Sequence, residues 1–175
     1  MNPLGIILVA GAGVLAYNLF STARTALKLD YRILKFQIYN FASGGNIVFR
    51  CRIRFVNNEN TALHIKKVSF AAYYNAKFTE SDGKITSVSS RGTRIASCDD
   101  KSEFVIPALS NIEKDFYIES KWSNLLSIVG LSVFNYLVND ENLIDNLIGK
   151  PILIDGAIRA EGVTVSFKNS ISISQ

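Results

Sequence analysis

Apolar side chains occupy every second position of residues 47–55, and this run constrains the fold more than any other feature of the sequence. One face carries apolar residues and the other carries arginines: Ile47, Phe49, Cys51, Ile53 and Phe55 against Arg50, Arg52 and Arg54. A period of two is typical of a β-strand with one buried face. The run therefore predicts a strand in a sheet that covers a core on one side.

Similar alternation recurs along most of the chain, interrupted by clusters of Gly, Ser, Asn and Asp. It predicts further strands at residues 27–38, 63–74, 77–79, 84–88, 94–98, 102–106, 115–119, 152–158, 163–167 and 171–174. Leu34 shifts the phase of the first strand, which predicts a β-bulge or bend, and residues 43–45 and 57–60 predict turns. We expect a mainly β fold, an antiparallel β-sandwich of about seven strands.

Two parts of the chain, residues 121–148 and the N-terminus, are predicted to be helical instead. Residues 121–137 place large apolar side chains at helical spacing behind Ser120, a suitable N-cap, and a shorter helix over 141–148 ends before Gly149. We therefore expect one or two helices inserted before the last strands. The other stretch is at the N-terminus.

Residues 1–23 contain no charged side chain, and residues 4–20 (LGIILVAGAGVLAYNLF) predict a hydrophobic helix. About 17 residues is the lower limit for crossing a hydrocarbon core of about 30 Å. Basic residues follow this run, whereas a signal peptide has them before it, and basic flanks stay cytoplasmic. We expect an uncleaved membrane anchor (1–23) and a cytoplasmic sandwich domain (24–175). The alternative is a helix that packs on protein inside a large assembly such as a virion.

The anchor helix is rich in small residues. Ala12 and Ala16 have the spacing that lets two helices approach closely, which predicts a homo-oligomer, although small residues also occur on helices that face lipid alone. The residues expected to contact lipid or a partner protein are Leu4, Ile6, Ile7, Leu8, Val9, Gly11, Ala12, Gly13, Val14, Leu15, Ala16 and Phe20.

Positive charge is concentrated after the anchor. The whole chain has a formal charge of +4, but residues 24–67 hold nine basic and two acidic residues, a net charge of +7. Such a segment suits anionic head groups or another polyanion, and nucleic acid stays open as a ligand. The candidate contacts are Arg24, Lys28, Arg32, Arg50, Arg52, Arg54, Lys66 and Lys67. The alternative is an ordinary solvated sheet face.

Residues for catalysis or metal binding are sparse. His64, the single histidine, lies in a predicted strand, and the acidic pairs Asp99-Asp100 and Asp140-Glu141 are typical of caps and turns. Cys51 falls on an apolar face and Cys98 in a polar stretch, and a disulfide between them stays open. No zinc, phosphate-loop or dinucleotide motif is present. We expect no catalytic residue, metal, cofactor or small-molecule substrate.

The order of these segments resembles the group 2 late-embryogenesis-abundant family, also called the water-stress-and-hypersensitive-response (WHy) domain. The resemblance rests on the turn at Val56-Asn57-Asn58, on residues 63–70 (LHIKKVSF) and 104–108 (FVIPA), and on the return strand 154–158 (IDGAI). It implies a β-sandwich behind an N-terminal membrane helix, with a stress-protective role and no catalytic residues.

Three functions are compatible with the sequence. The first is a structural or assembly protein, anchored by residues 4–20, that presents its sandwich to partner proteins as a membrane-complex or minor virion component. The second is a stress-protective protein at a lipid surface. The third is a polyanion-binding module that uses the arginines of residues 50–54.

Overall fold

The computed structural model describes residues 24, 26–42, 46–82, 84–121 and 148–174. Arg24, Ala26 and Leu27 have helical backbone and lead into the first strand. The predicted helices at 4–20, 121–137 and 141–148 lie outside this part of the chain, apart from single residues at their ends, as does the predicted turn at 43–45. No helix within the described ranges is long and apolar enough to cross a membrane.

The fold is mainly β, as predicted. Its strands are β1 (Asp30–Ala42), β2 (Asn46–Asn57), β3 (Leu63–Tyr74), β4 (Lys77–Ser81), β5 (Lys84–Ser90), β6 (Thr93–Asp100), β7 (Phe104–Ile106), β8 (Ser110–Ser120), β9 (Pro151–Ala160) and β10 (Val163–Ser174). The described residues thus form ten strands, against about seven expected for the sandwich, and the short strands β4, β5 and β7 lie where the sequence predicts strands. Residues 163–167 and 171–174, predicted as two strands, form the single strand β10.

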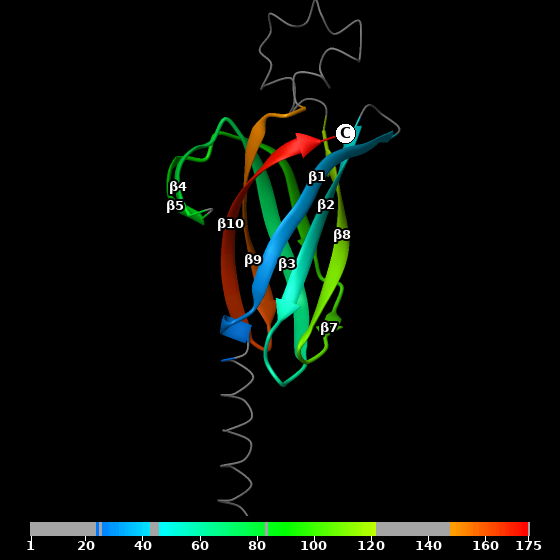
Figure 1. Cartoon of the computed structure of the whole chain (residues 1–175). Coiled ribbons are helices and arrows are strands. Elements are labelled where there is room, and N and C mark those ends of the chain that lie inside the picture. Colours follow the sequence, from blue (N-terminus) through cyan, green and yellow to red (C-terminus); the bar gives the residue numbers. More distant parts are fainter. Residues whose placement is uncertain (1–23, 25, 43–45, 83, 122–147, 175) are drawn as a thin grey trace, which may run out of the picture.

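The main sheet has the order β6-β3-β9-β10-β1-β2-β8, with β7 beside β3, while β4 and β5 form a separate hairpin (Figure 1). All pairings are antiparallel except one. β1 and β10 run parallel and share only two pairs of residues, Phe36 with Ile173 and Gln37 with Ser174. The predicted antiparallel arrangement therefore does not extend to this junction, where two halves of the sheet meet along a short parallel seam.

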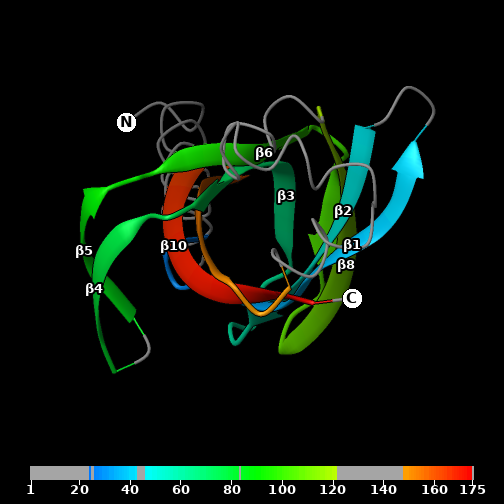
Figure 2. The same ribbon diagram turned by 90° about the horizontal axis from the view of Figure 1, so that it is seen from above.

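The sheet curls until its edge strands approach each other, as the view in Figure 2 shows. At one point the Ser120 hydroxyl donates a hydrogen bond to the carbonyl oxygen of Ile95. At another, Lys114 Nζ lies 3.4 Å from Asp100 Oδ2 and 4.3 Å from the ring centroid of Phe104. These contacts join β6 to β8 and close the gap that the curled sheet would otherwise leave.

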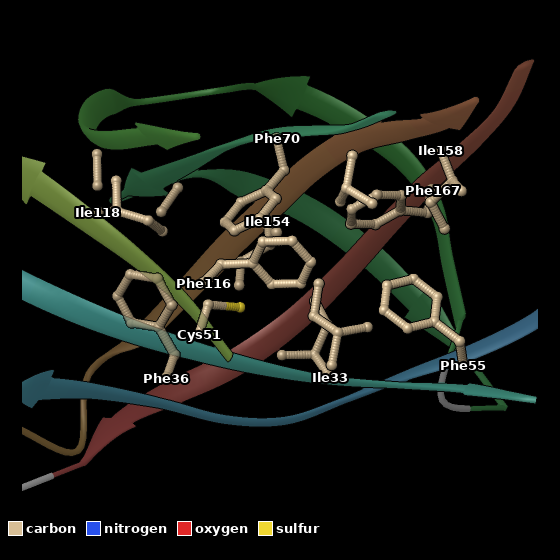
Figure 3. Packing of buried hydrophobic residues seen from close by; sticks show 14 of the residues in the cluster. Ile33, Phe36, Cys51, Phe55, Phe70, Phe116, Ile118, Ile154, Ile158 and Phe167 are labelled. Carbon is tan, nitrogen blue, oxygen red and sulfur yellow. The ribbon is translucent and has the colours of Figure 1, made fainter. Parts of the chain in front are cut away.

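The core fills the inside of this curl and is built from large apolar side chains (Figure 3). Residues of β2 alternate between buried and half-buried along its whole length, which confirms the predicted strand. Isoleucine is the most frequent residue of the described core, and aromatic rings pack among the aliphatic side chains: the rings of Phe70 and Phe116 meet edge to face with centroids 5.8 Å apart. The largest fully buried side chains are Phe36, Phe49, Phe55, Ile47, Ile53, Leu63, Ile65, Ile95 and Ile106.

The two cysteines take part in this core as free thiols. Cys51 is fully buried, as predicted, and burial raises the pKa of its thiol well above the ordinary value. Cys98 is half-buried, and burial raises its pKa to about 11. Both side chains therefore act as small apolar groups at neutral pH.

The predicted bulge at Leu34 is confirmed. The register between β1 and β2 shifts between Ile33 and Lys35, which leaves Ile33 and Phe36 both on the buried face. A second shift lies between Ile38 and Asn40 and was not predicted. Such bulges increase the local twist and bend the strand, which suits a sheet that must curl.

The strand directions give the curled sheet two distinct ends. The start of β1 pairs with the end of β2, the end of β2 with the start of β8, and the start of β3 with the end of β7. We call this the proximal end, comprising residues 24–30, 57–63, 106–110 and 160–163. Lys121 follows the end of β8, and Ile148 precedes the start of β9. Both therefore lie at the opposite end of the sheet, which we call the distal end.

Gly156 on β9 is required by close packing across the core. A Cβ at this position would lie 2.5 Å from Phe70 Cβ, 2.5 Å from the carbonyl oxygen of Ser69 and 2.7 Å from Phe167 Cζ. Glycine therefore lets two aromatic residues pack against the backbone of the strand.

We predict that Gly156→Ala lowers the free energy of unfolding by about 1–3 kcal/mol, because an extra methyl group overpacks the core. Urea denaturation of the full chain measures this. The matched control is Ala157→Ser on the opposite face of the same strand, where the side chain borders a surface hollow. Equal stability of the two variants would contradict the packing account.

Candidate functional site

The arginine row of β2 lies on the outer face of the sheet, between β1 and β8. Arg52 forms a two-pronged contact with Asp115, Nε to Oδ1 at 2.7 Å and a terminal nitrogen to Oδ2 at 2.8 Å. Arg54 donates from Nε to Glu113 Oε1 at 3.0 Å. The hydrogen bond and charge of Arg52 hold the pKa of Asp115 below its usual range. Two of the three arginines of this row are therefore bonded to carboxylates within the protein.

Arg50 is held by weaker contacts. Its guanidinium donates to Gln37 Oε1 at 3.0 Å, lies 4.0 Å from Asp115 Oδ2 and sits 5.7 Å from the ring centroid of Tyr39. Its Nε is buried without a hydrogen-bond partner in the described ranges. Arg50 is thus packed into the face and is not free to follow an extended ligand.

The other predicted basic contacts are divided among three places. Arg32 pairs in register with Arg54, so it joins the arginine row. Lys66 is exposed on β3, in the other half of the sheet, and Lys67 there forms an ion pair with Asp99 at 2.5 Å. Arg24 and Lys28 lie at the proximal end. The structure therefore does not bring the predicted basic residues into one patch.

A groove of about 870 Å³ opens between β1, β10 and the β4–β5 hairpin. The groove exists because β1 and β10 pair only near Phe36 and diverge toward the proximal end. There the rings of Tyr31 and Phe167, with centroids 5.0 Å apart, fill the gap between the two strands. Its lining carries both signs of charge and neither histidine nor cysteine: Asp30, Tyr31, Arg32, Ile33, Glu80, Lys84, Ile85, Ser166, Phe167, Lys168, Asn169 and Ser170. Such a lining suits a polar surface contact.

Asn57 organises the proximal end from a buried position, with 2% of its surface exposed. Its amide nitrogen donates to the carbonyl oxygens of Thr61 at 2.8 Å and Pro107 at 3.1 Å, and its amide oxygen accepts from the backbone of Glu59 at 3.1 Å. One side chain thus ties the β2–β3 turn to the β7–β8 turn. Sequence reasoning identified the turn but not this role, which depends on a segment fifty residues away.

The residues that follow the hydrophobic segment are fixed to the same end. Ala26 and Leu29 are buried in the core, and Lys28 Nζ lies 2.6 Å from Glu59 Oε1. The backbone N–H of Leu109 also donates to the carbonyl oxygen of Glu59, at 3.0 Å. Glu59 therefore joins the entering chain to both turns, and no flexible linker separates residue 26 from the domain.

The remaining candidates for chemistry are dispersed. His64 is exposed on β3, and its backbone N–H donates to Glu161 Oε1 at 3.1 Å. Asp99 and Asp100 are the last residues of β6 and form ion pairs with Lys67 and Lys114. Asp100 Oδ1 also accepts a hydrogen bond from the backbone N–H of Ser102 at 2.7 Å, as expected of a residue that begins a turn. Asp140-Glu141 lies outside the described residues. Within the described ranges, no three His, Cys, Asp or Glu side chains are grouped so as to hold a metal ion.

We predict that Asn57→Ala lowers the free energy of unfolding by about 2–4 kcal/mol, because three backbone groups lose their partner inside the protein. Denaturant unfolding of the full chain measures the effect. Asn111→Ala is the control, since Asn111 is exposed and pairs with the neighbouring residue of β2. A loss no larger than that of the control would refute the organising role of Asn57.

The arginine–carboxylate pairs predict a dependence of stability on pH. Because folding lowers the pKa of Asp115, its contribution is complete above the unfolded value of about 4 and is lost as pH falls through the folded value. Asp115→Asn should therefore reduce the loss of stability between neutral pH and about pH 3. Urea midpoints at the two pH values measure this, with Glu119→Gln as the control. If both variants lose as much stability in acid as the unmodified chain, the pair is irrelevant to acid stability.

Comparison with known proteins gives structural likenesses only. No protein-family model matches the sequence, and no curated protein matches it. Among solved structures, a protein from Archaeoglobus fulgidus aligns with a TM-score of 0.40 at 10% identity, over 84% of this chain and 96% of that one. A candidate late embryogenesis abundant protein aligns with a TM-score of 0.39 at 10% identity, over 94% and 87%.

The sporulation control protein Spo0M from Bacillus subtilis aligns with a TM-score of 0.38 at 11% identity, over 84% of this chain and 49% of that one. The predicted resemblance thus has a structural neighbour described as a late embryogenesis abundant protein, without a family match. With TM-scores below 0.5, these likenesses carry no argument about function, and the mainly β fold rests on the strands described above.

Proposed function

We propose that this protein is a non-enzymatic structural or assembly protein, held at a membrane by residues 4–20, whose sandwich is presented to partner proteins. The observation that carries the proposal is the rigid junction at residues 26–29. Ala26 and Leu29 are buried in the core and Lys28 is bonded to Glu59, so the chain that leaves the hydrophobic segment is part of the domain.

A rigid junction gives a tethered domain a defined orientation. Burying a leucine side chain contributes about 1.5–3 kcal/mol, and the ion pair with Glu59 adds a smaller amount because it is partly exposed. The junction therefore stays closed most of the time. A domain tethered in this way keeps one end toward the membrane, and a flexible linker would not provide this.

The distal end is the proposed contact region for partner proteins. Strands such as β2, with 12 residues at about 3.3 Å each, hold that end about 40 Å from the proximal end. Lys121 and Ile148 lie there, and the sequence between them is apolar, with Trp122, Leu126 and Phe134 among its residues. A membrane-complex component or a minor virion component would present such a segment away from the lipid.

Two observations support a role without catalysis. The groove beside β10 is lined without histidine or cysteine, and His64 stands apart from it on β3. Polyanion binding is less well supported, since Arg52 and Arg54 are bonded to carboxylates of β8. The stress-protective alternative rests on the family resemblance alone. We further propose that one partner is a second copy of the chain, associated through the face of Ala12 and Ala16.

We predict that Leu8→Lys/Val14→Lys moves the full chain out of the membrane fraction. Each lysine at the centre of a spanning helix costs about 2.5–3.5 kcal/mol, so the membrane-bound fraction should fall at least about tenfold. Flotation with liposomes after an alkaline wash measures it, and crosslinking of the floated protein reports self-association.

The matched control adds the same charge elsewhere. Ser87 and Ser97 are exposed strand residues, so Ser87→Lys/Ser97→Lys should float like the unmodified chain. If the unmodified chain stays in the soluble fraction, or if the Leu8/Val14 variant floats as well as the control, the anchoring proposal fails.

A further inference from the structure

Large apolar side chains are exposed at the proximal end. Among the described residues, Leu109 and Leu27 are the two most exposed large hydrophobic side chains, with 69% and 66% of their surface accessible, and Val105 follows nearby with 45%. The other two, Tyr39 and Tyr117, meet edge to face on the outer face, with ring centroids 4.9 Å apart. In the part of the chain that the structure describes, the large aliphatic side chains that are exposed thus lie at or near the proximal end.

Leu109 is held in a backbone conformation that a leucine adopts rarely. Its φ is +50°, in the left-handed region, where Gly, Asn and Asp are the usual residues. The other described non-glycine residues with positive φ are polar: Asn75, Asp82 and Glu161. A leucine at such a position, with its side chain in water, lowers the stability of the free domain, and strain of this kind concentrates at functional sites.

The two leucines are displayed by a rigid platform. The N–H of Leu109 donates to the carbonyl oxygen of Glu59, and the carboxylate of Glu59 binds Lys28, the residue after Leu27. Asn57 holds the turn that contains Glu59. The segments bearing Leu27 and Leu109 therefore meet at one residue, so both side chains belong to the same end surface.

We propose that the proximal end docks onto the interfacial layer of the lipid bilayer, with Leu27 and Leu109 inserted below the phosphate level. This inference rests on the proposed membrane anchor and assigns the surface that touches lipid. Leu27 lies seven positions after Phe20, a span of at most about 25 Å when extended. The anchor therefore brings Leu27 to within a short distance of the hydrocarbon boundary, where apolar groups insert readily.

The charges at this end suit a membrane surface better than a purely aqueous one. Lys28 is neutralised by Glu59, which lowers the cost of bringing its surroundings into the head-group region. Arg24 is exposed and can reach lipid phosphates while its stem covers apolar surface. Docking would therefore be driven by the apolar side chains, because Asp30 and Glu161 at the same end offset the charge of Arg24 and leave no gain from anionic lipid.

A fluorophore that senses polarity tests the proposal in the full chain. The dye is attached to Leu109→Cys, to Leu27→Cys or to the control Glu119→Cys, which lies ten residues further along β8 toward the distal end. Background labelling stays low because Cys51 is fully buried and burial raises the pKa of the Cys98 thiol to about 11, which leaves little reactive thiolate at neutral pH. The protein is reconstituted into vesicles of phosphatidylcholine with a minor fraction of phosphatidylserine, with and without brominated acyl chains that quench the dye.

The inference predicts blue-shifted emission at residues 109 and 27 and at least about threefold stronger quenching by brominated lipid than at residue 119. A second variant, Leu109→Asn, separates lipid contact from folding, because asparagine tolerates positive φ and should leave the fold at least as stable. In the Leu27→Cys background, Leu109→Asn should lower the quenching at residue 27 by about half.

Each other outcome decides a different claim. If the protein floats with vesicles but residues 109 and 27 report water as residue 119 does, the docking inference is overturned and the anchor remains. If these residues are shielded without quenching by brominated lipid, a protein partner covers the end and the inference is again overturned. If the protein does not float, the proposed function and the inference fall together.

Discussion

The inner face of the main sheet is apolar along its whole length, and among the described residues the sheet itself covers it together with Ala26 and Leu29. Phe36 and Phe49 stack, and the ring of Phe70 meets those of Phe116 and Phe167. Burial of these rings and of the aliphatic side chains around them is the main favourable contribution to folding. The sheet therefore curls, and Ser120 and Lys114 join its edge strands. This closure fixes the strand directions and so determines which turns share an end.

Two polar side chains then hold the turns of the proximal end together. Asn57 satisfies backbone groups of two turns from inside the protein, and Glu59 connects those turns to the entering chain. Buried polar groups with complete hydrogen bonds rigidify the segments that they join. The exposed Leu109 and Leu27 are therefore held at fixed positions. The outer face, with its paired arginines and carboxylates, is a solvated surface.

Much of this fold could be predicted from local sequence, because burial on one face leaves a period of two. The strand at residues 47–55 and the bulge at Leu34 follow from that pattern, as does the buried position of Cys51. The parallel seam between β1 and β10 could not be predicted, because no local pattern specifies which distant strands become neighbours. The ion pair of Arg52 with Asp115 depends on the same unknown register across 63 residues.

The candidate site was harder to predict than the fold for a related reason. The basic residues were treated as one set because they are close in sequence, yet Lys67 pairs with Asp99 in one half of the sheet and Arg54 with Glu113 in the other. Nothing in the sequence around Leu109 indicates a left-handed backbone, since leucine seldom adopts it. Its role emerges only when the β7–β8 turn is seen beside the residues that follow the hydrophobic segment.

The central claim is that the sandwich stands on its proximal end at a membrane surface. Neutron reflectometry of the full chain in a supported bilayer measures the thickness and position of the protein layer directly. The account predicts a layer about 40 Å thick in direct contact with the head groups, the length of its long strands. A layer of about 25 Å, as for a sandwich lying on its side, or a layer separated from the head groups by water, would contradict it.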